Sequence, residues 1–495
     1  MRLLSIVFLS WQSRGVYRIA TATRNPFFLP ALPNYTLAMQ LLDGFFRSPA
    51  VEPFFTDAAA VQSILDFEAA LARAQARAGI IPDNFATTIA SSCRADLFDL
   101  PALAQNMPSA GNLAIPLLKQ LTAIVARTSP DASRHIHCGA TSQDALDTGL
   151  LLQTRNATRA VQADLENIIS ALTDLTRVHR ETLLVARTWL QHALPTTFGF
   201  ITAGWLDACL EHRKRLRVLV EYSLVLQFGG AAGTLAALRD RGAQVAALLA
   251  DELGLPLPRI PWHAQRERIA EVASSYGILS GTFAKIARDL SLHMQTEVAE
   301  LAEPCITGRG GSSTMPHKQN AVACAAILAS TFRIPPLVTT ILSGLSGEYH
   351  RSLGRWQSEW ETLPEIIRLT AGASHQLAAL LPHLIVNTDR MRANLELTHG
   401  LIYAEAVTLA LSEKLNRAYV HKLVEEACRR AQCERRHLRE ILSADSEVTA
   451  ILNEPSLAQL FEPASYLGSA GTFIDGVLSS ANLQLRSTSK SKATG

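Results

Sequence analysis

The residues of this 495-residue chain whose types and spacing best suit chemistry lie in one polar loop between two long apolar segments. The loop runs from Gly308 to Ala321 with the sequence Gly-Arg-Gly-Gly-Ser-Ser-Thr-Met-Pro-His-Lys-Gln-Asn-Ala. Its glycines allow successive backbone N–H groups to converge on a negative group, and Lys318 adds a positive charge. Asn320 begins the next predicted helix, whose N-terminus favours an anion. The loop therefore fits an anion-handling site, although an ordinary surface loop has a similar composition.

Three other polar clusters lie far from this loop in the sequence. The turn Thr141-Ser142-Gln143-Asp144 precedes a long amphipathic segment and is typical of a helix N-cap. A helix N-terminus can equally offer its N–H groups to a ligand, so both interpretations stay open. The remaining clusters are residues 187–199 and residues 348–360. The second is rich in arginine and tryptophan, and an exposed helix junction would be its simplest explanation.

The order of residues in the polar loop resembles a known signature. Residues 311–320 read Gly-Ser-Ser-x-Met-Pro-x-Lys-x-Asn, which resembles the signature loop of the fumarase/aspartase/adenylosuccinate lyase superfamily. The resemblance implies that Ser312 is the base that removes a proton next to a substrate carboxylate. It implies that substrate is bound by Ser313, Met315, Lys318 and Asn320. Lys318 is also predicted to be catalytic, because its charge and the glycine-rich backbone can stabilise a serine alkoxide.

Two of the other clusters resemble further motifs of the same superfamily. Thr141 and Ser142 match Gly-x-Thr-Ser-x-Asp, in which the threonine and serine hydrogen-bond a substrate carboxylate. Residues 187–199 resemble Arg-Thr-His-x-Gln-x-Ala-x-Pro-x-Thr-x-Gly, which implies that Gln191 binds substrate. Trp189 stands where adenylosuccinate lyases carry a histidine proposed as the general acid. Trp189 is predicted to contact substrate instead.

Trp189 helps to decide which type of bond the enzyme breaks in its substrate. Elimination of an amine requires protonation of a poor leaving group, for which a histidine acid contributes about 10² to 10⁴ in rate. A carboxylate leaves readily near neutral pH, because its conjugate acid has a pKa of about 4. Trp189 therefore fits the formation or opening of a lactone better than loss of an amine. His192, three positions downstream, is interpreted as a packing or interface residue, since that offset moves a side chain by about 5 to 6 Å.

The cluster at 348–360 indicates a particular group within the superfamily. It is similar to the Glu-x-x-Arg-x-x-Gly-x-Trp-x-x-Glu-Trp segment of the bacterial 3-carboxy-cis,cis-muconate cycloisomerases, in which Arg351 is a natural bidentate partner for a substrate carboxylate. Arg355 falls at a variable position and receives no role. The likeness extends from about Met39 to Ala481. It implies an enzyme without cofactor or metal that interconverts a tricarboxylate, 3-carboxy-cis,cis-muconate, and a carboxymuconolactone in protocatechuate breakdown through the β-ketoadipate pathway.

Two alternative functions are kept beside this one. The first is an adenylosuccinate-type lyase that releases fumarate, against which Trp189 argues. The second is a non-catalytic structural helical bundle, against which the intact Ser312, Lys318 and Asn320 argue.

Long rigid elements are required to hold clusters so far apart in the sequence. Apolar residues recur at helical spacing in long runs, and no segment shows sustained period-two alternation, so the chain is predicted to be all-α. The predicted long helices cover the run after Asp144 and residues 57–78, 197–226, 266–303, 320–345 and 358–381. Their lengths favour an extended bundle. The resemblance implies a three-domain fold whose central bundle assembles into a homotetramer with active sites shared between subunits.

Composition shifts and turn signals suggest five divisions. They are an N-terminal extension over 1–38, an N-terminal helical domain over 39–138, a central long-helix domain over 139–386, a C-terminal helical domain over 387–486 and a disordered tail over 487–495. The extension has no acidic residue before Asp43 and is interpreted as non-functional sequence upstream of a natural start at Met39. Asn387 or Asp389 is the expected helix cap at the start of the C-terminal domain.

Bulk composition excludes several classes of protein. The formal charge of +2 is spread along the chain, so a nucleic-acid partner is not expected. No apolar run of 18 or more residues was identified, so no membrane span is expected either. The seven cysteines show no disulfide-like or zinc-like spacing and are interpreted as reduced, mostly buried thiols of a cytoplasmic protein.

Overall fold

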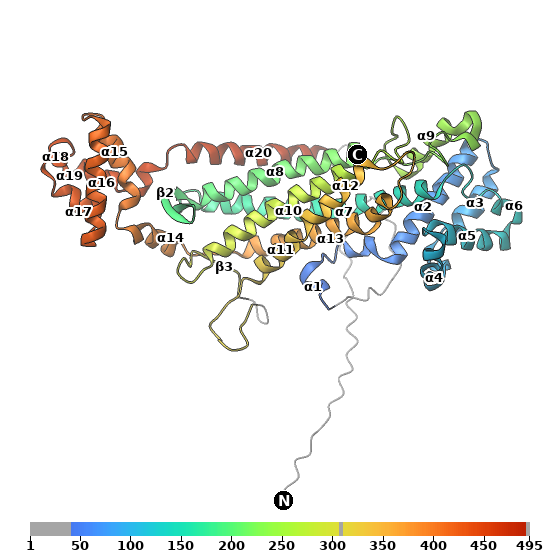
Figure 1. The fold of residues 1–495 in the computed structure, drawn as a ribbon, viewed down its shortest axis with the longest axis horizontal. Helices are drawn as coiled ribbons and strands as arrows, with labels where there is room; N and C mark the ends of the chain where they lie inside the picture. Colours follow the sequence, from blue (N-terminus) through green and yellow to red (C-terminus); the bar gives the residue numbers. More distant parts are fainter. Residues whose placement is uncertain (1–40, 306–309, 492–495) are drawn as a thin grey trace, which may run out of the picture. The chain divides into compact units, whose positions relative to one another are not determined.

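The computed structural model describes residues 41–305 and 310–491, with side chains as far as Ala481. The chain divides after Ala38 into two units, and only the second contains described residues. Helices dominate the described part of the chain (Figure 1), which confirms the all-α prediction. The predicted extension over 1–38 and two residues of the polar loop, Gly308 and Arg309, lie outside the described residues.

The N-terminal region is a group of helices in which α2 to α6 share one apolar core, whereas α1 packs against the later helices α11 (Val322–Phe332) and α13 (Arg355–Leu380). Its helices are α1 (Asp43–Phe46), α2 (Asp57–Arg77), α3 (Asp83–Ser92), α4 (Leu100–Ala110), α5 (Ala114–Thr128) and α6 (Pro130–Ser133). Helix α2 has the bounds that its apolar spacing predicted, and it begins where the Thr56 hydroxyl accepts a bond from Ala59 N. Helix α9 (Gly242–Leu253) packs against α2 and shares its apolar core, although it follows the first two bundle helices in the sequence.

The central bundle consists of long helices that lie side by side (Figure 1). They are α7 (Ser142–Val178), α8 (Phe198–Tyr222), α10 (Glu267–His293), α11 (Val322–Phe332), α12 (Ile334–Ser343) and α13 (Arg355–Leu380). The apolar stripe predicted for α10 is buried in the core, and Phe283 and Ile286 are fully inaccessible. Loss of such a ring, as in Phe283→Ala, typically costs about 3 to 5 kcal/mol.

One predicted bundle helix is broken in the structure. The helix expected over 320–345 divides at Arg333 into α11 and α12, because Pro335 and Pro336 cannot donate the backbone bonds that would continue it. In the described part of the chain, one helical segment, residues 322–346, could span a membrane if only its length and its apolar composition are considered. The sequence interpretation missed this segment. In the structure, it packs against α10 and α13 within the bundle.

A second predicted helix ends early. The run expected as helix over 266–303 stops at His293, and Ala299 adopts a positive φ of 51°. Leu301–Ala302 then form strand β3, antiparallel to β4 (Ile385–Val386). His293, the last residue of α10, contacts Glu300 through its ring and through its carbonyl oxygen, which accepts from Glu300 N at 3.0 Å.

A β-hairpin that the sequence did not predict follows α7. Strand β1 (Leu183–Thr188) pairs with β2 (Gln191–Thr197), and the hairpin projects beyond the end of the bundle (Figure 1). A bulge between Val185 and Arg187 interrupts the alternation that would have revealed the strands. The polar cluster at 187–199 therefore lies mostly in this hairpin, and its last residues begin α8.

The C-terminal region is a second group of short helices. Its helices are α14 (Thr388–Leu395), α15 (Ala404–Ser412), α16 (Arg417–Glu434), α17 (Leu438–Ser443), α18 (Ser446–Ile451) and α19 (Glu454–Leu460). Asn387 caps α14 as predicted, since its side chain accepts from Arg390 N. The final helix α20 (Ala470–Ser491) returns along α8 and joins the core of the bundle.

Helix α20 extends into the predicted tail. The tail predicted to be disordered from Ser487 begins inside α20, because neither Pro nor Gly interrupts residues 477–494; residues 492–495 lie outside the described part.

Three cysteines are buried, whereas Cys305 and Cys433 are exposed, so the expectation of mostly buried thiols holds only in part.

Candidate functional site

The turn before α7 is held by one buried carboxylate. Asp144 accepts hydrogen bonds from the backbone N–H groups of Thr141 (3.0 Å), Gly229 (3.0 Å) and Gly230 (2.9 Å). Its Oδ1 also lies 2.6 Å from Nε2 of His263. These contacts fix the turn against the chain before α9 and leave the side chains of Thr141 and Ser142 half-buried at the N-terminus of a 37-residue helix. Such a helix end stabilises a bound anion.

Gly139 explains the tight approach to this turn. It adopts a φ of 76°, and a Cβ there would lie 2.5 Å from Cγ of Leu238. A glycine is required on both counts, because other residues are strained in this conformation and would collide with the leucine.

Arg351 lies beside the same turn. Its Nε donates to Oε1 of Gln143 at 2.9 Å, and its Nη2 lies 3.4 Å from the carbonyl oxygen of Ala231. The guanidinium is exposed. With Nε bound to Gln143 and one N–H of Nη2 donated to Ala231, one further N–H on each terminal nitrogen remains to form the edge that binds a carboxylate end-on. The structure thus brings together three of the predicted substrate-binding residues, Thr141, Ser142 and Arg351.

Arg355 stabilises the segment that carries Arg351. Its Nη1 donates to the carbonyl oxygen of Ser343 (2.7 Å) and to the hydroxyl of Ser346 (2.5 Å), so it ties the start of α13 to the end of α12. Its Nε also lies 3.6 Å from the Glu348 carboxylate. Arg355 received no role from the motif, because it falls at a variable position.

The polar loop forms its own small hairpin. Gly311 pairs with Gln319, and both N and Nδ2 of Asn320 donate to the carbonyl oxygen of Gly310, at 2.8 and 3.1 Å. The hydroxyl of Ser312 accepts from the backbone N–H groups of Thr314 (3.3 Å) and Met315 (3.0 Å). Donors of this kind stabilise a negative serine oxygen, as the proposed base requires. The side chains of Ser313, Met315, Lys318 and Asn320 are exposed.

One expectation about this loop was wrong. The helix after it begins at Val322, and its first N–H groups do not face an open anion site. Glu303 occupies that position, since its carboxylate accepts from Ala323 N (3.1 Å) and Cys324 N (3.0 Å). The negative charge favoured at this helix N-terminus is therefore supplied by the protein itself.

The β1–β2 hairpin presents apolar side chains to solvent at its tip. Trp189 and Leu190 form the two-residue turn with φ values of 52° and 64°, a conformation that normally selects Asn and Gly. Trp189 is 97% exposed and Leu190 76% exposed. A strained turn with apolar side chains is explained if the tip contacts another molecule. Gln191 is also exposed, at the start of β2.

Below the tip, a buried ion pair joins the hairpin to the bundle. Arg187 donates to both carboxylate oxygens of Glu300, at 3.0 and 2.7 Å. His293 Nδ1 (2.5 Å) and Asn394 Nδ2 (2.7 Å) contact the same carboxylate. Burial alone would raise the pKa of Glu300, but the bonds from His293, Arg187 and Asn394 outweigh burial and lower its pKa to about 2. Sequence reasoning missed Glu300 and His293, which belong to no motif.

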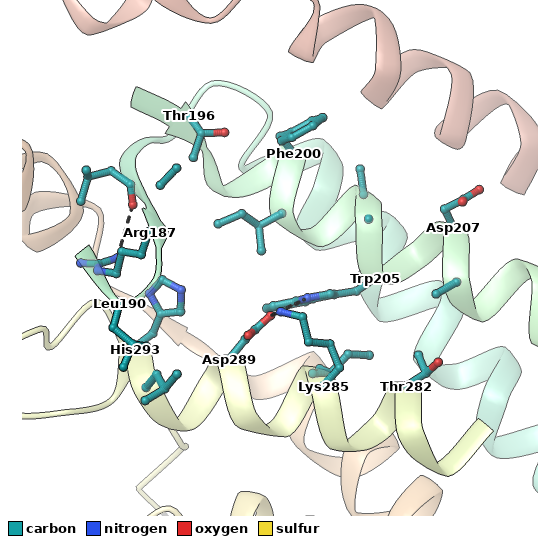
Figure 2. A pocket seen from close by; sticks show the side chains of 18 of the residues that line it. Arg187, Leu190, Thr196, Phe200, Trp205, Asp207, Thr282, Lys285, Asp289 and His293 are labelled. Carbon is teal, nitrogen blue, oxygen red and sulfur yellow. Dashed lines mark hydrogen bonds and ion pairs between the residues drawn. The ribbon is translucent and has the colours of Figure 1, made fainter. Parts of the chain in front are cut away.

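A cavity of about 1220 Å³ lies between this hairpin, α8, α10 and α20. Figure 2 shows Arg187 and His293 at one end and Lys285 beside Asp289 farther along α10. Lys285 and Asp289 form an ion pair, so their charges largely cancel. Of the predicted substrate-binding residues, the lining contains Trp189, but it contains neither Arg351 nor the polar loop.

His192 also lines this cavity. Its Nδ1 is buried and has no hydrogen-bond partner among the described residues. Burial, and then the charge of Arg187, lower the pKa of His192, so the ring is neutral near pH 7. Within the described residues, no group of three or more His, Cys, Asp or Glu side chains is placed to hold a metal ion.

The predicted residues fall into three groups that one chain does not bring together. Thr141, Ser142 and Arg351 lie at the N-terminus of α7, whereas the hairpin follows its C-terminus. At 1.5 Å per residue, the 37 residues of α7 separate these groups by about 55 Å. The polar loop projects separately, between β3 and α11 (Figure 1).

Comparison with known proteins assigns the chain to a family. A model described as "Lyase" matches residues 47–335, and one described as "Adenylosuccinate lyase C-terminus" matches residues 400–477. The chain therefore belongs to the lyase family that the motifs and the helical bundle indicated.

Individual relatives with similar sequences indicate a particular enzyme within this family. The chain is 49% identical over 441 residues to the 3-carboxy-cis,cis-muconate cycloisomerase of Pseudomonas aeruginosa, covering 89% of this chain and 96% of that protein. It is 50% identical over 445 residues to the protein of the same name from Bradyrhizobium diazoefficiens, covering 90% and 99%. The crystal structure of 3-carboxy-cis,cis-muconate lactonizing enzyme from Pseudomonas putida matches with a TM-score of 0.85 at 45% identity, covering 90% and 99%. The resemblance predicted from the motifs is confirmed.

Proposed function

We propose that this protein is a cycloisomerase that interconverts 3-carboxy-cis,cis-muconate and a carboxymuconolactone in the breakdown of aromatic acids through protocatechuate. The observation that carries the proposal is the near full-length similarity to proteins of that name. Trp189 supports it, because a residue that does not titrate stands where an amine-eliminating relative needs an acid.

The reaction can be written from the residues of the polar loop. In the lactone-opening direction, Ser312 as its alkoxide removes the proton from the carbon next to a carboxylate. The electron pair of that C–H bond forms the new C=C bond, and the ring C–O bond breaks to release a carboxylate. In the lactonising direction, the carboxylate adds to the double bond and Ser312 returns the proton.

The structure supports Ser312 in this role through its backbone contacts. The N–H groups of Thr314 and Met315 already point at its hydroxyl and would stabilise the alkoxide. Lys318, exposed on the same loop, supplies the positive charge that an alkoxide or a developing dianion requires. Both contributions act where charge accumulates during proton removal.

The carboxylates of the substrate are bound by the remaining predicted residues. The N-terminus of α7 with Thr141 and Ser142, and the terminal nitrogens of Arg351, form one anion-binding group. The other predicted contacts come from the hairpin and from the polar loop, namely Trp189, Gln191, Ser313, Met315 and Asn320. Asn320 closes the base of its loop in this chain and offers only its exposed side to a ligand.

Each complete site is built from more than one subunit of a homotetramer. The separation of about 55 Å along α7 prevents a single chain from bringing the hairpin to Thr141. Large apolar side chains exposed on this chain support the assembly, because burying apolar surface between subunits is favourable. They are Trp189 (97%), Ile278 (55%), Phe332 (64%) and Leu342 (44%).

The proposal is tested by mixing the purified protein with 3-carboxy-cis,cis-muconate and following the absorbance of the conjugated diene. Loss of the signal, with lactone as the product, is expected. Adenylosuccinate is assayed in parallel, and no release of fumarate is expected. A folded oligomer that leaves the muconate unchanged would refute the proposal, and release of fumarate would favour the adenylosuccinate-type alternative. Inactivity with both substrates would favour the structural bundle.

A further inference from the structure

Gln143 is a fully buried amide whose three hydrogen bonds define its orientation. Its Nε2 donates to Oδ2 of Asp147 at 3.1 Å and to the carbonyl oxygen of His263 at 2.9 Å. Its Oε1 accepts from Nε of Arg351 at 2.9 Å. Flipping the amide would set the NH₂ group against a guanidinium and the oxygen against a carboxylate and a carbonyl, so only one orientation satisfies all the partners.

A buried cluster of charges anchors this amide. Arg266 lies between two carboxylates and donates to Asp147 at 2.7 and 3.2 Å and to Glu359 at 3.0 Å. Trp356 Nε1 donates to Asp147 Oδ1 at 2.9 Å. Burial would lower the pKa of Arg266, but the carboxylates outweigh burial and raise it. Arg266 and Trp356 thus hold the Asp147 carboxylate in place as an acceptor, and through it the core of the bundle determines where the Gln143 oxygen points.

We infer that Gln143 is a positioning residue that orients the guanidinium of Arg351 towards the substrate. This inference rests on the proposed function and adds a residue to it. By engaging Nε, the amide turns the two terminal nitrogens of Arg351 outward as a bidentate edge. Because the amide is a neutral acceptor, it orients the guanidinium without neutralising it. A carboxylate at this position would form an ion pair with Arg351 and compete with the carboxylate of the substrate.

The same contacts would also exist if Gln143 only stabilised the bundle. The two roles differ in one measurable respect. A positioning residue acts through Arg351, so its loss has no further effect once the guanidinium is gone. A purely structural residue has the same effect with or without Arg351.

A double-mutant cycle therefore separates the two roles. Gln143→Met, Arg351→Ala and the double variant are compared with wild type by kcat and KM for the muconate, with circular dichroism and sedimentation to check folding and assembly. Gln143→Met is expected to raise KM about 10- to 100-fold, the usual cost of one hydrogen bond to a charged group. In the Arg351→Ala background it is expected to change KM less than twofold. Equal effects in the two backgrounds, or no effect in wild type, would overturn the inference.

Two further variants control for the loss of a buried amide in general and for a failure to fold. Gln153→Met removes a buried glutamine on the same helix that donates to the carbonyl oxygen of Phe54, and it is expected to leave KM unchanged. If Gln143→Met does not fold, Gln143→Asn takes its place in the cycle, since it keeps a buried amide but withdraws its oxygen by one methylene. It is expected to raise KM in the wild-type background alone.

A binding experiment keeps this inference distinguishable from the proposed function. The same four proteins are titrated calorimetrically with propane-1,2,3-tricarboxylate, which presents three carboxylates and does not react. If wild type fails to convert the muconate but the tricarboxylate binding shows the expected coupling, the proposed function fails and the role of Gln143 stands. Additive losses in binding, or a wild type that does not bind the tricarboxylate, would overturn the role of Gln143.

Discussion

Glu300 connects the hairpin to the bundle, and its replacement by glutamine is expected to destabilise the protein measurably. The carboxylate is fully buried and contacts Arg187, His293 and Asn394. Its pKa falls from 4.5 to about 2, and a shift of this size corresponds to about 3 kcal/mol of folding free energy at pH 7. Because the pKa is depressed in the folded state, this contribution is complete above pH 4.5 and is lost as the pH falls through about 2.

The assay is urea denaturation of wild type and Glu300→Gln at pH 7 and at pH 3, read by helical circular dichroism at constant protein concentration. The difference in stability is expected to be about 3 kcal/mol at pH 7 and about 1.5 kcal/mol at pH 3. Glu211→Gln is the matched control, because Glu211 pairs with Lys214 where both side chains are 47% exposed. Its effect is expected to stay below about 1 kcal/mol. A Glu300→Gln difference below 1 kcal/mol at pH 7, or one independent of pH, would refute the reasoning.

Three further predictions concern the loop, the hairpin tip and the turn before α7. Ser312→Ala is expected to abolish turnover of the muconate while oligomer size and helicity stay unchanged; residual activity above about 1% of wild type would exclude a serine base. Trp189→Ser is expected to shift the protein towards smaller species in analytical ultracentrifugation, because it removes an exposed apolar anchor; an unchanged distribution would remove this tip from the interface. Burial opposes protonation of His137, but the Glu68 carboxylate 2.6 Å away outweighs burial and raises the pKa of His137. The resulting stabilisation is complete below pH 6.5 and lost as pH rises through the raised pKa, so His137→Gln should flatten thermal stability over that range; an unchanged pH profile would contradict this.

The long helices could be predicted from the sequence because their apolar spacing is a local signal. The bounds of α2 and the cap at Asn387 follow from residues adjacent in the chain. The hairpin could not be predicted in the same way, since its bulge between Val185 and Arg187 disrupts the period of two. The contacts of Glu300 beside the end of α10 could not be predicted either, since its partner Arg187 lies 113 residues away.

The candidate site was predictable to a similar extent. Motifs predict Ser312 and Arg351 because a motif depends only on residues within a short stretch of chain. They could not reveal that Gln143 bonds to Arg351 across 208 residues, or that Glu303 occupies the N-terminus of α11. Those contacts exist only after the bundle has folded. The homotetramer, the domain boundaries and the cytoplasmic location stay predictions.

We propose that a serine base and a carboxylate-binding arginine from different subunits form one cycloisomerase site. Subunit mixing tests it most directly. Ser312→Ala and Arg351→Ala proteins, each expected to keep only a small fraction of wild-type activity alone, are unfolded together in equal amounts, refolded and assayed for loss of the diene absorbance. If the two residues of a site come from different subunits, random assembly restores roughly a quarter of wild-type activity. Mixed oligomers that form but are no more active than the parent variants would contradict a site shared between subunits.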